Sequence, residues 1–191
     1  PSGMPAGPAP EANVYPFYRR DAAVALREAV ERFDGGRAVV TTPDTSLTCG
    51  GAPLKFALLL EDYLDRRGRL DGAEVVLTRP TDALFGTSDV KAPYERALRE
   101  HWRDRAITFR PDFTPDRVDT TAGVVHGEDG DGVSFDLLAP VTPQGPLDVL
   151  EDSALAGEDG YVAVDPHTLR HREYDAVHAV GDCTDVPTSK T

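Results

Sequence analysis

The sequence is poor in several features that mark particular classes of protein. Its 191 residues include only two cysteines, far from the dense framework of a small secreted disulfide protein. No run of about 18 apolar residues is present, so no segment is predicted to span a membrane. The first residues have neither the basic start nor the apolar stretch of a signal peptide. The composition indicates a globular domain whose cysteines either pack as inert thiols or carry chemistry.

Positive charge is scarce as well. The sequence has 20 Lys and Arg against 33 Asp and Glu, which gives a formal net charge of −13. A surface of this sign repels the phosphates of nucleic acids and the anionic headgroups of lipids. We therefore exclude nucleic acid as a partner of this chain.

The apolar pattern predicts helices alternating with strands. Helical spacing covers 21–33, 53–67 and 92–103, strand-like runs cover 37–42, 73–78, 106–109, 137–141, 161–164 and 176–180, and a hairpin or meander covers 119–136. The first strand–helix–strand unit has the crossover length that a parallel pair needs. We therefore predict an α/β fold: a Rossmann-like three-layer domain with a parallel sheet and a small antiparallel hairpin or meander as a flap.

The loop after the first predicted strand is where a dinucleotide-binding domain carries its phosphate-binding glycines. Here residues 45–53 read Thr-Ser-Leu-Thr-Cys-Gly-Gly-Ala-Pro, and the pattern G-x-G-x-x-G does not occur. The second strand ends at Thr78-Arg79-Pro80, without the acidic residue that would hold a ribose. The unit has the layout of a nucleotide-binding domain without its nucleotide chemistry.

Cys49 stands in place of those glycines, at the N-terminus of the next predicted helix. Backbone N–H groups and the helix dipole at such a position favour a thiolate and make a cysteine more reactive. A loop thiol that only packs explains the position about as well.

Cys183 follows the last predicted strand, in the segment Gly181-Asp182-Cys183-Thr184. Open α/β sheets bind ligands at the carboxyl ends of their strands, and Asp182 could accept a hydrogen bond from a sugar-like hydroxyl. A lone Gly-Asp is more often a turn. Two thiols so placed could form a redox disulfide, but a structural disulfide, worth roughly 5 kcal/mol in the chain-entropy model, is an open alternative.

Two segments resemble the sulfide:quinone oxidoreductases, a family of FAD-dependent pyridine nucleotide-disulfide oxidoreductases. Residues 49–55, Cys-Gly-Gly-Ala-Pro-Leu-Lys, resemble the family's Cys-x-Gly-Ala-Pro-x-Lys loop and helix. Residues 180–191, Val-Gly-Asp-Cys-Thr-Asp-Val-Pro-Thr-Ser-Lys-Thr, resemble the Gly-Asp-Cys-Thr-x-x-Pro-Thr-Ser-Lys-Thr segment of the subgroup that includes the mitochondrial enzyme. The rest of the chain is similar in layout only.

The resemblance implies roles for individual residues. Cys49 and Cys183 would be the sulfide-oxidising pair beside the flavin, and Gly181, Asp182 and Lys190 would lie at FAD. Sulfide would attack the disulfide at Cys183 and leave a persulfide there, while Cys49 would act on the flavin. Two electrons would pass through FAD to a quinone, so sulfide and quinone are the implied partners.

The resemblance also implies a division into domains. We expect a linker or arm over 1–20, the second, NAD(P)-binding-like domain over 21–175, and the start of the return into the FAD-binding domain over 176–191. The family's first FAD-binding half and its membrane-docking part have no counterpart here. We therefore expect a soluble internal segment of a peripheral membrane protein, which by itself binds no FAD and is inactive.

Other assignments stay open. A related flavin-dependent disulfide oxidoreductase, a flavocytochrome sulfide dehydrogenase or a type II NADH dehydrogenase would share the layout, although the missing glycines argue against an NADH enzyme. A non-catalytic Rossmann-like domain with structural thiols or a structural disulfide is the alternative from another class. No metal site is expected, because the five histidines lack the spacing of metal ligands.

Overall fold

The computed structural model describes residues 4, 7–44, 49–85, 88 and 91–187. The chain divides into two compact units. The first, called the sheet unit, comprises Pro1–Asp44 and Gly51–Thr142. The second, called the tail unit, comprises Thr45–Gly50 and Pro143–Thr191.

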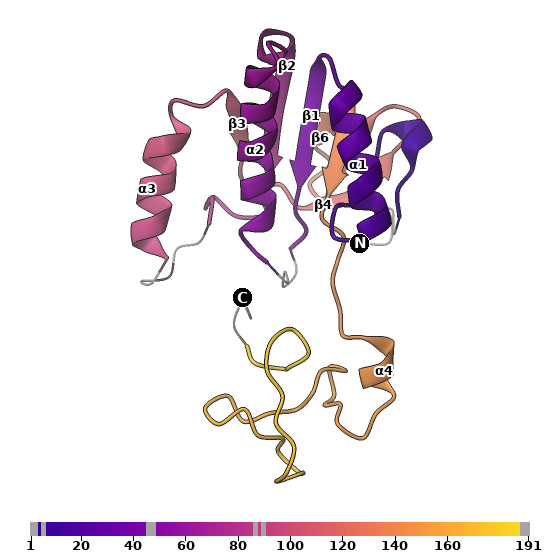
Figure 1. The fold of residues 1–191 in the computed structure, drawn as a ribbon, viewed down its shortest axis with the longest axis vertical. Coiled ribbons are helices and arrows are strands. Elements are labelled where there is room, and N and C mark those ends of the chain that lie inside the picture. The colour runs from indigo at the N-terminus through magenta and orange to yellow at the C-terminus, as the bar shows by residue number, and fades with distance from the viewer. Residues whose placement is uncertain (1–3, 5–6, 45–48, 86–87, 89–90, 188–191) are drawn as a thin grey trace. The chain divides into compact units, whose positions relative to one another are not determined.

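A four-stranded sheet in the order β3-β2-β1-β7 forms the centre of the sheet unit (Figure 1). Its strands are β1 (Gly36–Thr41), β2 (Ala73–Thr78), β3 (Ile107–Arg110) and β7 (Leu137–Pro140). All three pairings are parallel. The parallel sheet predicted from the sequence is therefore confirmed, with β1 hydrogen-bonded on both sides.

Helices cover one face of this sheet. They are α1 (Arg20–Arg32), α2 (Ala52–Arg66) and α3 (Ala92–Trp102), and α1 and α2 lie on the same side of the strands in Figure 1. Successive strand residues point to opposite faces. Ala38 and Val40 of β1 therefore face the helices and share one core cluster with apolar side chains of α1 and α2.

The other face is covered by a three-stranded antiparallel sheet in the order β4-β5-β6. Its strands are β4 (Pro115–Asp119), β5 (Val124–Gly127) and β6 (Gly132–Ser134). Val39 of β1 and Leu138 of β7 point to this side and form a second core cluster with Val125 and Val133. Helices, parallel sheet and antiparallel flap make up the three layers that the sequence predicts.

Residues 13–15, which fall in the segment expected to be an arm, pack along the free side of β7. They follow a short 3-10 turn, η1 (Pro10–Ala12). The N–H of Tyr15 donates to the Leu138 carbonyl at 2.9 Å, and the N–H of Leu138 donates to the Asn13 carbonyl at 2.9 Å. Val14 and Tyr15 are buried, so this stretch belongs to the core.

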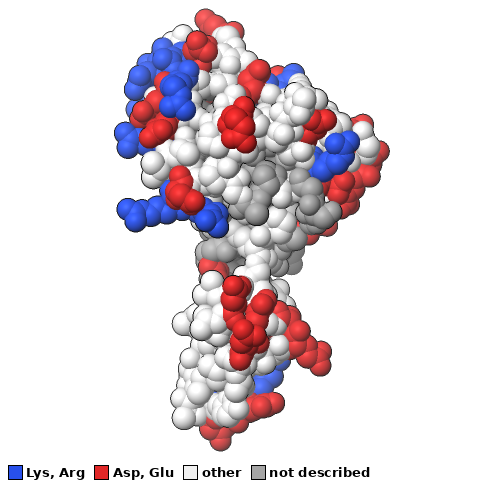
Figure 2. All heavy atoms as spheres, turned by 90° about the vertical axis from the view of Figure 1, so that its right-hand side faces the viewer, with Lys and Arg blue, Asp and Glu red and all other residues white. Residues whose placement is uncertain are grey.

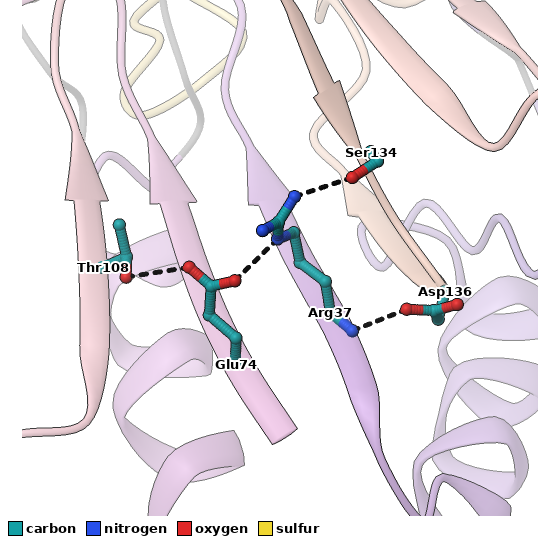
Figure 3. Close-up of polar contacts among 5 residues, drawn as sticks. All are labelled: Arg37, Glu74, Thr108, Ser134 and Asp136. Atoms are coloured by element: carbon teal, nitrogen blue, oxygen red, sulfur yellow. Dashed lines mark hydrogen bonds and ion pairs between the residues drawn. The ribbon is translucent and has the colours of Figure 1, made fainter. Parts of the chain in front are cut away.

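A polar network joins β1 to its neighbours at the start of the strand (Figure 3). Arg37 donates from Nε to Glu74 at 2.7 Å and from Nη1 to Ser134 Oγ at 2.6 Å. Its backbone N–H donates to Asp136 at 2.7 Å, and Thr108 donates to the second oxygen of Glu74 at 3.1 Å. One arginine thereby links two strands of the parallel sheet to the flap.

The tail unit has little regular structure. Its described residues include one short helix, α4 (Asp148–Glu151), together with turns and isolated β-bridges. Val162 and Val164 are buried there, and Val162 bridges Ala156 and Thr184.

The strands predicted over 161–164 and 176–180 are not formed, and this part of the prediction is wrong. Residues 161–164 pair only through single bridges, and in 176–180 the pairing is a single bridge at His178. Val180 is 74% exposed, so the second run has no buried face to hold it in a ladder. Strand propensity reflects packing against neighbouring strands, and an apolar run without them stays irregular.

The other predicted elements of the sheet unit are confirmed within a few residues at their ends. A short 3-10 turn before β2, η2 (Leu70–Gly72), was not among the predicted elements. Within the described ranges, no helix combines the length and the apolar character needed to cross a membrane.

The flap-side core yields a stability prediction. Leu138 is 0% exposed and Leu59 is 66% exposed, so the two leucines form a matched pair. We expect Leu138→Ala to lower the free energy of unfolding by about 2–5 kcal/mol, because it leaves a cavity between the sheet and the flap. We expect Leu59→Ala to change it by only about 0.5 kcal/mol.

Urea unfolding followed by the fluorescence of Trp102, the only tryptophan in the sequence, measures both variants. Equal shifts of the unfolding midpoint would show that Leu138 does not belong to the core.

Candidate functional site

Cys49 lies in the turn that leads into α2, two residues before the helix N-cap, Gly51. Pro53 occupies the first helical turn, where its missing N–H costs nothing, so the helix starts where the sequence predicts. The Lys55 N–H donates to the Gly51 carbonyl at 3.0 Å. Cys49 itself is half-buried.

Cys183 lies in a tight turn that begins at Gly181. Gly181 has φ +87°, a left-handed conformation that glycine adopts at no steric cost. The backbone N–H of Thr184 donates to the Gly181 carbonyl at 3.1 Å, and the Thr184 hydroxyl donates to the same oxygen at 2.9 Å. The Cys183 thiol donates to the Val180 carbonyl at 3.4 Å and is half-buried.

Backbone hydrogen bonds fix this turn to the buried segment around Val162. The Val162 N–H donates to the Cys183 carbonyl at 2.8 Å, and the Asp185 N–H donates to the Val162 carbonyl at 3.1 Å. Val162 is 3% exposed and Thr184 is 1% exposed. The main chain from Cys183 to Asp185 is thus tied to the buried segment around Val162.

The Asp185 carboxylate adds a second anchor. One oxygen accepts the Val164 N–H at 3.0 Å, and the other accepts Arg172 Nη2 at 2.7 Å. The Asp185 side chain is only 9% exposed. The Arg172 N–H also donates to the Ala163 carbonyl at 3.0 Å, which places the guanidinium beside the carboxylate.

A cavity of about 490 Å³ lies beside this ion pair, and His171, Arg172, Ala163 and Asp185 are among its lining residues. His171 Nδ1 accepts the N–H groups of Glu173 at 3.0 Å and Tyr174 at 3.2 Å. The other ring nitrogen, Nε2, therefore carries the proton and donates to the Leu155 carbonyl at 3.0 Å. The buried ring acts here as a structural brace.

The predicted site residues are brought together only in part. Both cysteines lie in the tail unit, as thiols that no disulfide joins. The prediction that Cys183 follows a strand of the parallel sheet is wrong, because residues 176–180 form no strand. Lys190 lies outside the described residues.

The surroundings of Gly181 and Asp182 are compatible with a bound cofactor. A Cβ built on Gly181 would have no atom within 4 Å, and Asp182 is exposed. The turn therefore presents an open side on which a large group such as a flavin nucleotide could lie. Among the described residues, no cluster of three His, Cys, Asp or Glu side chains could hold a metal ion.

Acidic residues dominate the tail unit. Residues 143–191 hold ten Asp and Glu against three Lys and Arg, and Figure 2 shows this excess on the face turned to the viewer. Arg172 and Arg170 are the two arginines of the segment, and each is paired with a carboxylate. Both cations among the described residues of the unit are therefore paired with carboxylates.

Sequence comparison finds relatives among enzymes that oxidise sulfide. The mitochondrial sulfide:quinone oxidoreductase of Mus musculus is 31% identical over 190 residues, which cover 95% of this chain and 42% of that protein. The mitochondrial enzyme of Dictyostelium discoideum is 32% identical over 161 residues, which cover 82% of this chain and 35% of that protein. The chain thus spans about two fifths of the length of these relatives. No protein-family model matches it.

Solved structures show the same fold. The sulfide:quinone oxidoreductase of Aquifex aeolicus has a TM-score of 0.74 at 16% identity, covering 96% of this chain and 44% of that chain. A NAD-dependent persulfide reductase from A. fulgidus has a TM-score of 0.60 at 18% identity, covering 95% and 32%. At such identities the likeness shows the Rossmann-like architecture alone.

Two residues that interact beside the Cys183 turn could not be identified from the sequence. They are Arg172 and Asp185. Asp185 stands two positions after the cysteine, where a polar side chain signals no particular role. Arg172 lies in a charged run, His171 to Glu173, that suggests only a solvated surface. Their pairing depends on the tertiary fold of the tail unit.

A nearby turn of the tail unit gives a pH prediction. The Asp165 carboxylate accepts the Thr168 N–H at 2.8 Å, the Thr168 hydroxyl at 2.9 Å and the His167 N–H at 3.1 Å. These bonds, led by that from the Thr168 N–H, hold the pKa of Asp165 below its ordinary value of 3.8. A lowered pKa in the folded state means that the turn is fully stabilised above pH 3.8 and loosens as the pH falls through the lowered value.

We therefore expect the NMR shift of the Thr168 amide proton to move with a midpoint below pH 3.8. In the control variant Asp165→Asn, this movement should disappear. A midpoint at or above that pH would contradict the hydrogen-bonded turn.

Proposed function

The chain is homologous to a segment of the mitochondrial sulfide:quinone oxidoreductases, and we propose that it supplies the redox-active cysteines of a flavoprotein that oxidises sulfide. In this proposal the pair is Cys49 and Cys183, FAD takes up the electrons, and a quinone receives them. Because quinones partition into lipid, the whole protein would work at a membrane surface.

The observation that carries the proposal is the placement of the two thiols. They are far apart in the sequence but belong to the same compact unit, and each is half-buried. A half-buried thiol is reachable for an ion as small as hydrosulfide and is shielded from larger nucleophiles. The sequence relationship to the mitochondrial sulfide:quinone oxidoreductase of Mus musculus covers 95% of the chain.

The proposed reaction starts from a disulfide between Cys49 and Cys183. Hydrosulfide attacks the Cys183 sulfur, a new sulfur–sulfur bond forms there, and the Cys49 thiolate leaves. Cys183 then carries a persulfide, whose outer sulfur passes to an acceptor thiol or another sulfur compound. Release of two electrons from the two thiolates restores the disulfide, so each cycle oxidises one sulfide.

FAD, when bound, supplies the acceptor for these two electrons and passes them to the quinone. The residues proposed to hold it are Gly181 and Asp182, on the open side of the Cys183 turn, together with Lys190. The Asp182 carboxylate would accept a hydrogen bond from a hydroxyl of the cofactor, and the Lys190 ammonium would balance negative charge.

Replacing either cysteine tests this function in the flavin-bound protein. We expect Cys49→Ser and Cys183→Ser to abolish the bleaching of flavin absorbance by sulfide, because a serine oxygen forms no disulfide for hydrosulfide to open. Bound FAD, measured by its absorbance after gel filtration, should stay at the parent level.

Dithionite is the control, because it reduces bound flavin without the cysteines and should bleach all three proteins alike. If sulfide still bleaches the flavin absorbance of Cys49→Ser, then Cys49 and Cys183 are not the redox-active pair. In that case the two thiols would be packing residues of a non-catalytic domain.

A further inference from the structure

We propose that Arg172 and Asp185 are positioning residues for Cys183, and that their ion pair holds the turn on which the thiol is presented. The use of the thiol rests on the proposed function. The holding of the turn is a property of the fold and can be tested separately.

Asp185 connects three chain segments. One carboxylate oxygen accepts the Val164 N–H at 3.0 Å, and the other accepts Arg172 Nη2 at 2.7 Å. Its own backbone N–H donates to Val162 at 3.1 Å. A carboxylate that is 9% exposed and has a bonding partner at each of its two oxygens is held in one orientation.

Asp185 is also close enough in the chain to control the position of Cys183. Only Thr184 separates them, and its side chain is buried at 1% exposure and bonded back to Gly181. The Cys183 carbonyl is fixed by the Val162 N–H at 2.8 Å. Val164, which binds the Asp185 carboxylate, and Val162, which binds the Cys183 carbonyl, belong to the same short segment. A shift of Asp185 would therefore also move the turn that carries the thiol.

The backbone of Arg172 is itself fixed in place. Its backbone N–H donates to the Ala163 carbonyl at 3.0 Å, between the two valines that hold the turn. The preceding residue, His171, is 3% exposed and braced by three hydrogen bonds. The Arg172 side chain is itself 55% exposed, so the ion pair reaches the nearly buried Asp185 carboxylate from a fixed backbone position but from the solvent side.

The ion pair matters because nothing regular supports this turn. The described part of the tail unit offers no helix or ladder around Cys183, and disulfide exchange requires the two sulfurs and the attacking ion to meet within a narrow geometry. Without Arg172, the nearly buried Asp185 carboxylate would move toward water, and the adjacent turn that carries Cys183 would move as well.

A second ion pair in the same unit serves as the matched control. Arg170 Nη1 lies 3.2 Å from Asp175, and the two side chains are 52% and 88% exposed. Arg170→Gln removes the same charge from the same unit as Arg172→Gln, two residues away. Among the described residues, the side chain of Arg170 pairs with Asp175, which lies outside the turn at 181–184.

The first measurement is the rate at which iodoacetamide labels each cysteine of the reduced chain, read by mass spectrometry. In Arg172→Gln we expect labelling of Cys183 to accelerate about five-fold, because the thiol loses its half-buried setting. The rate at Cys49, the internal reference, should be unchanged. Arg170→Gln should match the parent at both cysteines.

The second measurement is the equilibrium of the Cys49–Cys183 disulfide against a glutathione buffer. Arg172→Gln should lower the effective concentration of the two thiols about ten-fold, because the thiols are no longer held for each other. Arg172→Lys keeps the charge but not the planar fork of the guanidinium. Its effective concentration should therefore lie between those of Arg172→Gln and the parent.

The two measurements separate failure of this inference from failure of the proposed function. Labelling and disulfide equilibrium that are the same in Arg172→Gln and Arg170→Gln overturn the positioning role, whatever the cysteines do in catalysis. A parent chain that forms no disulfide, together with faster labelling of Cys183 in Arg172→Gln, overturns the proposed pair but supports the positioning role. Equal labelling rates at both cysteines in Arg172→Gln would mean that the tail unit has unfolded. In that case Arg172→Lys is the deciding variant. Labelling at the parent rates in Arg172→Lys would contradict a role for the planar guanidinium fork of Arg172.

Discussion

Strand β1 is the element on which the sheet unit depends. It is paired on both sides, with β2 and with β7, and its successive residues Ala38, Val39 and Val40 point alternately to opposite faces. Each face is closed by a different layer, helices on one side and the antiparallel flap on the other. The part of a strand that is buried on both faces is mostly apolar, and this is why the run Ala38–Val40 is so easily recognised in the sequence.

Such double burial also explains which parts of the fold could be predicted. Strand β2 coincides with the predicted 73–78, and α2 begins beside Pro53, because these elements carry strong local signals. The runs 161–164 and 176–180 have similar β-branched residues, yet they form isolated bridges. Propensity alone does not reveal whether a neighbouring strand is available, and Val180, at 74% exposure, shows what happens without one.

The candidate site divides in the same way. Cys49 and Cys183 could be singled out because each stands in a motif with a recognisable order of residues. Arg172 and Asp185 could not, because an arginine in a charged run looks like an ordinary surface residue until the fold brings it to a carboxylate at 2.7 Å. Residues that carry chemistry can leave a local pattern in the sequence, whereas residues that hold them in place are defined by tertiary contacts.

Among the described residues, two other carboxylates are arranged like Asp185, and they explain why it should restrain a turn. Glu61 of α2 accepts the Ala106 N–H and an Arg105 guanidinium, and Glu95 of α3 accepts the Leu84 and Phe85 N–H groups while pairing with an arginine. In each case a carboxylate no more than 11% exposed binds backbone N–H groups of a segment outside its own and an arginine. A chain with a net charge of −13 has few cations to spare. Three of them pair with carboxylates that are no more than 11% exposed, where solvent screens the carboxylate charge less than at an exposed pair, so these carboxylates hold their backbone partners more firmly. In the described part of the tail unit, where no sheet is formed, the segment held by such a carboxylate is the one that carries Cys183.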